Sequence, residues 1–249
     1  MIASGLLLVG LALTSCTAKT TASSSDPELE AKVLEIIRKN PQVILDAVQA
    51  YRQEQEANRR KAQQEFLDNM LNNPKAVIDR SPTMGSTDQS IVLVMFSDFQ
   101  CPYCAEAHKE IKAFMEKHRD QVTFAYKHLP LVSIHPEALP AAKAAWAAMQ
   151  QGKFWEYQDA LFTNQDKLGD QQYIAIAKSL GLDVDKFNRD RASDDAAKAI
   201  QTDVELAESL GINGTPFLIM NGEVVEAGPE LPTQLEATLA KVKQAKTKK

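Results

Sequence analysis

The sequence contains few cysteines and no excess of positive charge, and both shortages exclude classes of function. A structural zinc site needs four ligands, but only Cys16 remains beside Cys101 and Cys104, and the histidines are not paired at ligand spacing. A formal net charge of −5 gives no reason to expect a nucleic acid as a partner. We therefore predict no metal, no other cofactor and no nucleic-acid partner.

The apolar segment near the start of the chain lacks the length of a transmembrane helix. Residues 2–13 run into Leu13-Thr14-Ser15-Cys16, which resembles a bacterial lipoprotein signal over residues 1–16, although no Lys or Arg precedes the apolar run. The resemblance implies a lipid anchor on Cys16, and the absence of Asp after it indicates the outer membrane. A cleaved secretion signal with a chance cysteine is the alternative. Both predict a periplasm-facing protein of the bacterial cell envelope, an oxidising compartment.

A linker and two apolar helices are predicted next. Residues 17–26 are rich in Thr, Ser and Ala, which is typical of a flexible linker. Apolar residues then recur at helical spacing in two segments separated by Asn40-Pro41: Leu29, Val33, Ile36 and Ile37, then Ile44, Ala47, Val48 and Tyr51. Residues 52–65 favour a helix with almost no apolar face. We predict a helical oligomerisation region over residues 27–73; a hairpin folding back on the main domain is the alternative.

Cys101 and Cys104 enclose Pro102 and Tyr103 directly after a strongly apolar run. Residues 91–96 predict a strand buried on both faces, and residues 105–119 predict an amphipathic helix with Pro102 in its first turn. The Cys101 sulfur would then lie over the free N–H groups of the helix start, which favour a thiolate. Cys104 could attack the mixed disulfide that Cys101 forms. We predict a redox dithiol; a zinc site and an inert disulfide are the alternatives.

The remaining pattern predicts an α/β domain over residues 74–249. Strands are expected at residues 76–78 and 121–127, followed by a hairpin over 217–225 with Asn221-Gly222 at its turn. A helical insertion is expected over about residues 134–210, with helices at 137–150, 154–162, 171–180 and 192–210. Residues 231–242 predict the last helix.

This arrangement resembles the DsbA family of bacterial envelope thiol-disulfide oxidoreductases, in its DsbA-like and ScsC-like branches. The resemblance rests on residues 96–104, 151–155 and 211–216 and covers about residues 74–245. It implies a thioredoxin-like fold with an inserted helical subdomain. It also implies that Pro216 is a cis proline against the cysteine pair and that Thr215 presents its backbone to a bound substrate; an ordinary trans proline is the alternative. The preceding helices resemble the oligomerisation region of ScsC-like proteins.

One family feature is missing. The best known members carry a buried acid six residues before the first cysteine, and this chain has Met95 there. Asp98 remains as a possible acid or base, with loop capping as the alternative. Lys127 is expected either near the site or at a solvated strand end, and His108 at the surface.

These observations predict an oligomeric enzyme of disulfide chemistry. We expect an envelope thiol:disulfide oxidoreductase with protein disulfide isomerase activity, assembled as a homodimer or homotrimer. Its partners would be protein substrates with thiols or disulfides, and a membrane or periplasmic redox partner. The alternatives are a monomeric DsbA-like dithiol oxidase, a glutaredoxin, and a lipoprotein chaperone or adhesion protein whose cysteines are incidental.

Overall fold

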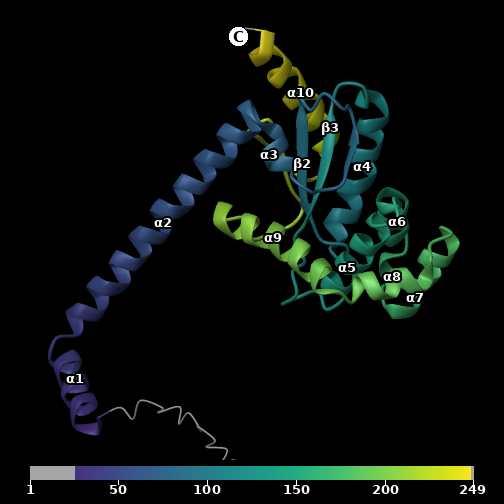
Figure 1. Ribbon diagram of the computed structural model, residues 1–249. Coiled ribbons are helices and arrows are strands. Elements are labelled where there is room, and N and C mark those ends of the chain that lie inside the picture. Colours follow the sequence, from purple (N-terminus) through teal and green to yellow (C-terminus); the bar gives the residue numbers. More distant parts are fainter. Residues whose placement is uncertain (1–25, 248–249) are drawn as a thin grey trace, which may run out of the picture. The chain divides into compact units, whose positions relative to one another are not determined.

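The computed structural model describes residues 26–247 (Figure 1), and the chain divides into two units, residues 1–53 and 54–249. The predicted signal, nearly all of the linker and Cys16 lie outside the described residues. The first unit contains α1 (Pro27–Lys39) and the beginning of α2 (Pro41–Asn72). Asp26 caps α1 by accepting a hydrogen bond from the Glu28 N–H at 3.0 Å, and Pro27 occupies its first turn.

The helices of the first unit leave their apolar side chains exposed. No residue of α1 is buried. Between 43% and 62% of the surface is exposed for each of Leu29, Val33, Leu34, Ile36, Val43, Ile44, Leu45, Val48 and Tyr51. Exposed large apolar side chains that recur along two helices favour a place where another molecule binds.

The second unit is built on a five-stranded sheet with the order β1-β3-β2-β4-β5. The strands are β1 (Thr83–Gly85), β2 (Val92–Ser97), β3 (Thr123–His128), β4 (Phe217–Met220) and β5 (Glu223–Val225). Only β2 and β3 are parallel; the other pairs are antiparallel. The predicted buried strand and the hairpin at Asn221-Gly222 are confirmed. Asn221 also accepts a hydrogen bond from the Val92 N–H at 2.7 Å, which fastens the hairpin to the central strand.

Helices cover both faces of the sheet. Successive side chains of β2 point to opposite faces, so Leu93 and Met95 belong to one core while Val92, Val94 and Phe96 belong to the other. The first core packs against α4 (Pro102–His118) and α10 (Leu231–Thr247). The second core packs against α3 (Pro74–Ile78) and the ends of α2 and α9 (Asp194–Leu210). Both faces of β2 are therefore buried, as its apolar run predicts.

The helical insertion follows β3. It comprises α5 (Ala138–Met149), α6 (Phe154–Thr163), η1 (Gln165–Lys167), α7 (Asp170–Ser179), α8 (Val184–Arg191) and α9 (Asp194–Leu210). Lys127 joins it to the sheet, because its Nζ lies 3.0 Å from Asp203 Oδ1 of α9. Asp203 Oδ2 also accepts the His128 N–H at 2.9 Å. Lys127 is only 3% exposed, so the interpretation as a solvated strand end is wrong.

Three elements differ from the sequence predictions. Residues 76–78 belong to helix α3 and not to a strand, because Pro74 starts a helix and a short apolar run does not distinguish the two structures. The strand β1 lies in a polar stretch for which we predicted no strand, since an edge strand with alternating exposure carries little apolar signal. Helix α8 was missed because Phe187 is its only buried residue.

Candidate active site

The start of α4 holds the two cysteines at different depths. Cys101 is the N-cap residue, Pro102 is the first helical residue, and the Cys104 N–H donates to the Cys101 carbonyl at 3.1 Å. Both cysteines are free thiols. Cys101 is 4% exposed and Cys104 is fully buried, whereas Tyr103 between them is 68% exposed. Cys101 therefore keeps a small exposed fraction beside the exposed Tyr103, whereas Cys104 has none, an order that suits an attacking and a resolving thiol.

The two thiols have opposite acidity. The Cys104 thiol lowers the pKa of Cys101 to about 5 as the largest cause, with smaller contributions from Thr215 and from the N–H groups of Cys104 and Tyr103. Burial raises the pKa of Cys104 well above its usual range, and its bond to the Cys101 sulfur raises it further. At neutral pH the dithiol therefore consists of a Cys101 thiolate and a Cys104 thiol. The helix start contributes as predicted, but the neighbouring thiol contributes more.

Thr215 and Pro216 face this cysteine pair. The peptide bond between them is cis, as the resemblance implies, and Cys101 Sγ lies 3.4 Å from the Thr215 carbonyl oxygen. A groove of about 710 Å³ adjoins them, lined by residues that include Tyr103, Glu106, Thr215, Pro216, Ala227 and Pro229. Sequence reasoning found Thr215 and Pro216 through the resemblance, but the loop that contains Ala227 and Pro229 gave no signal.

The Asp98 carboxylate is buried and held by three donors. It accepts the Gln100 N–H at 2.7 Å, the Leu131 N–H at 2.9 Å and His135 Nδ1 at 2.7 Å. These bonds tie the segment before Cys101 to the loop after β3. Such a geometry favours loop capping over proton transfer as the role of Asp98.

Other polar groups lie on the face of the sheet that packs against α4, the helix that contains Cys104. Ser97, Tyr126 and His128 are buried there, and Ser97 and His128 are paired in the register of β2 and β3. Ser97 Oγ, Tyr126 Oη and His128 Nδ1 have no hydrogen-bond partner within the described residues. Burial lowers the pKa of His128 to about 4 and raises that of Tyr126, so both are neutral at pH 7. Sequence reasoning missed these three groups because they alternate with apolar residues on buried strands.

Gln165 of the insertion also supports the active-site loop. Its Nε2 donates to the Phe99 and Cys101 carbonyls, both at 2.8 Å. His108, which we expected at the surface, has a side chain only 13% exposed, with Nε2 2.9 Å from Asp159 Oδ1. That expectation is therefore wrong. Neither contact could be read from the sequence, because each partner lies about fifty or more residues away.

Residues 77–241 match the model of the thioredoxin family, so the chain belongs to this family. A thioredoxin-like oxidoreductase from Silicibacter pomeroyi is 28% identical, with a TM-score of 0.61 over 71% of this chain and 97% of that one. The catalytic domain of Proteus mirabilis ScsC is 25% identical, with a TM-score of 0.59 over 74% of this chain and 97% of that domain. The protein alpha-DsbA2 from Wolbachia pipientis, at 23% identity and a TM-score of 0.61 over 77% and 97%, shares the fold. The predicted fold class and DsbA-family resemblance are confirmed.

Several curated proteins that are named as antiporters also match part of the chain. The protein named Na(+)/H(+) antiporter NhaA 3 from Salinispora tropica is 36% identical over 144 residues, which cover 58% of this chain and 22% of the antiporter. The chain thus spans about a fifth of the length of the curated relatives that it matches. Within residues 26–247, no helix is both long and apolar enough to cross a membrane.

Proposed function

We propose that the protein is a thiol:disulfide oxidoreductase of the bacterial envelope that acts on protein substrates through Cys101 and Cys104. The observation that carries this proposal is the pairing of a Cys101 thiol of pKa about 5 with a buried Cys104 thiol whose pKa is raised. A thiolate is the nucleophile of disulfide exchange, and a protonated thiol beneath it is held in reserve for the second step. The oxidoreductase among the similar structures supports the same activity.

The exchange proceeds in two steps. The Cys101 thiolate attacks one sulfur of a client disulfide, forms a mixed disulfide and releases the other sulfur as a thiolate. Cys104 then loses its proton and attacks Cys101 Sγ, which releases the second client thiol and leaves a Cys101–Cys104 disulfide. Two electrons have then passed to the client. When a thiol of the client attacks the mixed disulfide instead, the client is isomerised and the enzyme returns as a dithiol.

The groove beside Thr215 and Pro216 would hold the client segment that carries the reacting sulfur. Tyr103, which is largely exposed, is among the residues that line this groove. Thr215 offers its backbone next to Cys101, so an extended client segment could bond to the main chain there while its sulfur reaches the thiolate. We propose Asp98 as a residue that positions this loop through its three hydrogen bonds.

We further propose that residues 27–53 assemble the protein into a homodimer or homotrimer with isomerase activity. The exposed apolar side chains of α1 and α2 are too few for a core of their own, and a second copy presents the same surface. Two or more dithiols around a shared space would keep a misfolded client bound between successive exchanges. A lipid anchor on Cys16, in the outer membrane, and an envelope redox partner complete this proposal.

Insulin reduction by cysteine variants tests the activity. We expect Cys101→Ser to abolish reduction and Cys104→Ser to accumulate mixed disulfides with the client. Retained reduction in Cys101→Ser would instead favour a chaperone or adhesion protein with incidental cysteines. The mass of the mature protein in solution tests the assembly, because a monomer at micromolar concentration would favour the simple dithiol oxidase.

A further inference from the structure

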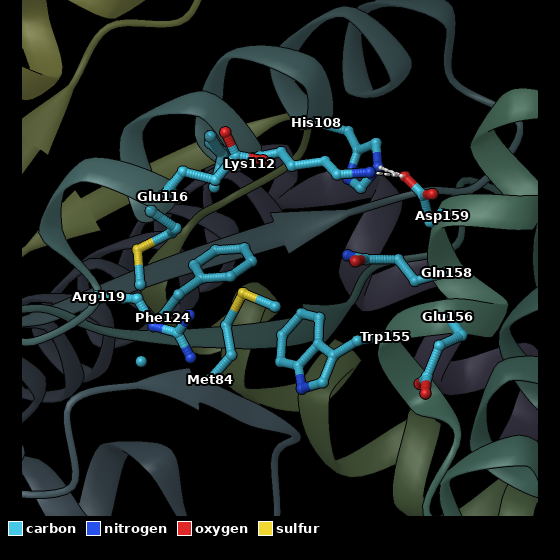
Figure 2. Close-up of a pocket in the computed structure, with 13 residues that line it drawn as sticks. Met84, His108, Lys112, Glu116, Arg119, Phe124, Trp155, Glu156, Gln158 and Asp159 are labelled. Carbon is cyan, nitrogen blue, oxygen red and sulfur yellow. Dashed lines mark hydrogen bonds and ion pairs between the residues drawn. The ribbon is translucent and has the colours of Figure 1, made fainter.

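A second cavity lies on the other flank of α4, away from the Thr215 groove. It has a volume of about 380 Å³ and is bounded by α4, β1, β3 and α6 (Figure 2). Its α4 residues include Ile111, Met115 and Glu116, whereas Tyr103, Glu106 and Glu110 line the groove. At about 100° of rotation per residue, the two sets lie on nearly opposite sides of the helix. The cavity is therefore separate from the dithiol.

The floor of this cavity is apolar and deformable. It is formed by two methionines, two aromatic residues and one isoleucine: Met84, Met115, Phe124, Trp155 and Ile111. Methionine side chains adapt to different shapes and make favourable sulfur contacts with aromatic rings. A surface of this composition accommodates large apolar groups of more than one shape.

Gln158 places an unused amide inside the cavity. The residue is 3% exposed, and Figure 2 shows its amide pointing between Trp155 and the His108–Asp159 pair with no hydrogen bond drawn to it. The amide atoms are not among the buried side-chain atoms left without a partner, so they open onto the cavity, where water can bond to them. A ligand that offers both a donor and an acceptor could take the place of that water.

The other polar groups at the cavity already have partners or lie at its exposed rim. His108 Nε2 and Lys112 Nζ both lie 2.9 Å from Asp159 Oδ1. The Trp155 indole N–H donates to the Thr83 carbonyl at 3.1 Å. The rim carries Arg119 together with Glu116 and Glu156, so it favours neither an anion nor a cation. Gln158 is left as the polar group available to a neutral ligand.

We propose that this cavity binds a large apolar side chain of an unfolded client polypeptide, with Gln158 bonding to the client's backbone amide. A site for one defined small molecule usually presents several polar groups that fix its orientation. Here the cavity offers one amide and an adaptable apolar floor. The floor can accept different apolar side chains, and the amide can bond to the peptide backbone that all of them share. This inference rests on the proposed function for its choice of ligand, and it gives the enzyme a hold on clients that does not involve their cysteines.

Peptide binding can be followed through Trp155, because the chain has only two tryptophans and Trp146→Phe leaves Trp155 as the single reporter. The probe is a cysteine-free peptide with one phenylalanine between polar residues, compared with the same peptide carrying alanine. We expect the phenylalanine peptide to shift the Trp155 emission saturably and to bind at least tenfold more tightly than the alanine peptide. Absence of a saturable shift, or equal binding of the two peptides, would overturn the proposal.

Two variants locate the binding. Met84→Glu introduces a carboxylate into the apolar floor and should weaken peptide binding at least tenfold, whereas Thr83→Glu, on the neighbouring residue outside the cavity, should leave it unchanged. Gln158→Leu keeps the apolar contact and should weaken binding several-fold, since one buried hydrogen bond is lost. Unchanged binding in Met84→Glu or in Gln158→Leu contradicts the assigned contacts.

The test separates this inference from the proposed enzyme activity. The Cys101→Ser, Cys104→Ser double variant should bind the peptide as the parent does, because no thiol takes part. Met84→Glu should react with a small soluble disulfide at the parent rate, which also shows that it is folded. Peptide binding without any disulfide exchange would refute the proposed function alone, and exchange without peptide binding would refute this inference alone.

Discussion

Residues 27–53 and residues 54–247 both form amphipathic helices, but the apolar side chains are exposed in the first region and buried in the second. In the first region Leu29, Ile36 and Leu45 are each at least 60% exposed. In the second, Ile111, Ile200 and Leu235 are each at most 2% exposed, because a sheet or another helix covers them. The comparison shows that apolar periodicity predicts a helix equally well in both regions and does not tell what covers it. The described structure leaves the large apolar side chains of the first region exposed, whereas it buries those of the second region within its own unit.

Deleting the first region should have the largest effect on assembly. We expect removal of residues 27–53 to yield a monomer that reduces insulin at the parent rate per dithiol but loses most isomerisation. The deletion should stop at Gln53, because Phe66 and Met70 of α2 belong to the core of the second unit. Light scattering and refolding of a scrambled disulfide protein measure the two outcomes. A deletion protein that isomerises as well as the parent would show that the catalytic unit suffices.

Breaking the buried ion pair should most strongly destabilise the second region. Lys127→Met leaves the Asp203 carboxylate buried without its cation, which should lower the free energy of unfolding by about 3–5 kcal/mol. The double variant Lys127→Met, Asp203→Leu should recover part of this loss, since no unpaired charge remains, although the His128 N–H loses its acceptor. Urea unfolding measures both. If the single variant were as stable as the parent, the pair would not be what fastens α9 to β3.

The acidity of Cys101 should make the stability of the reduced protein depend on pH. Its pKa is lowered to about 5 in the folded protein, against an unfolded value of about 8.5. The stabilisation is therefore fully present above the unfolded pKa, decreases as pH falls and is lost below pH 5; at pH 7 it is on the order of 2 kcal/mol.

Urea unfolding of the reduced protein between pH 4 and 9 tests this dependence, with Cys101→Ala as the reference. The difference in stability between the two proteins should grow with rising pH. A constant difference would mean that Cys101 has an ordinary pKa.

The sequence predicted elements with a strong local pattern and missed contacts between distant residues. The strand β2, the start of α4 and the Asn221-Gly222 hairpin each follow from a few consecutive residues. The bonds from Gln165 to the Cys101 carbonyl, and from Lys127 to Asp203, join residues 64 and 76 positions apart. A polar residue on a helix has the same appearance in a sequence whether it faces water or a buried partner. The candidate dithiol was therefore predictable from its local motif, but its supporting bonds and the cavity around Gln158 were not.

The smallest expected change in stability separates the two regions most sharply. Ile44 is 45% exposed on α2 within the first unit, so Ile44→Ser should change the stability of the second unit by less than about 0.5 kcal/mol. If a second copy covers Ile44, the same substitution should weaken the oligomer, because it removes a large apolar side chain from the contact. Gln42→Ser, on the same helix, is the matched control, since its side chain is polar and bonds to Asp46. Sedimentation across a range of concentrations should show dissociation of Ile44→Ser at concentrations where the control stays assembled. Identical sedimentation of the two variants would place the contact between copies elsewhere on α1 or α2, or remove it altogether.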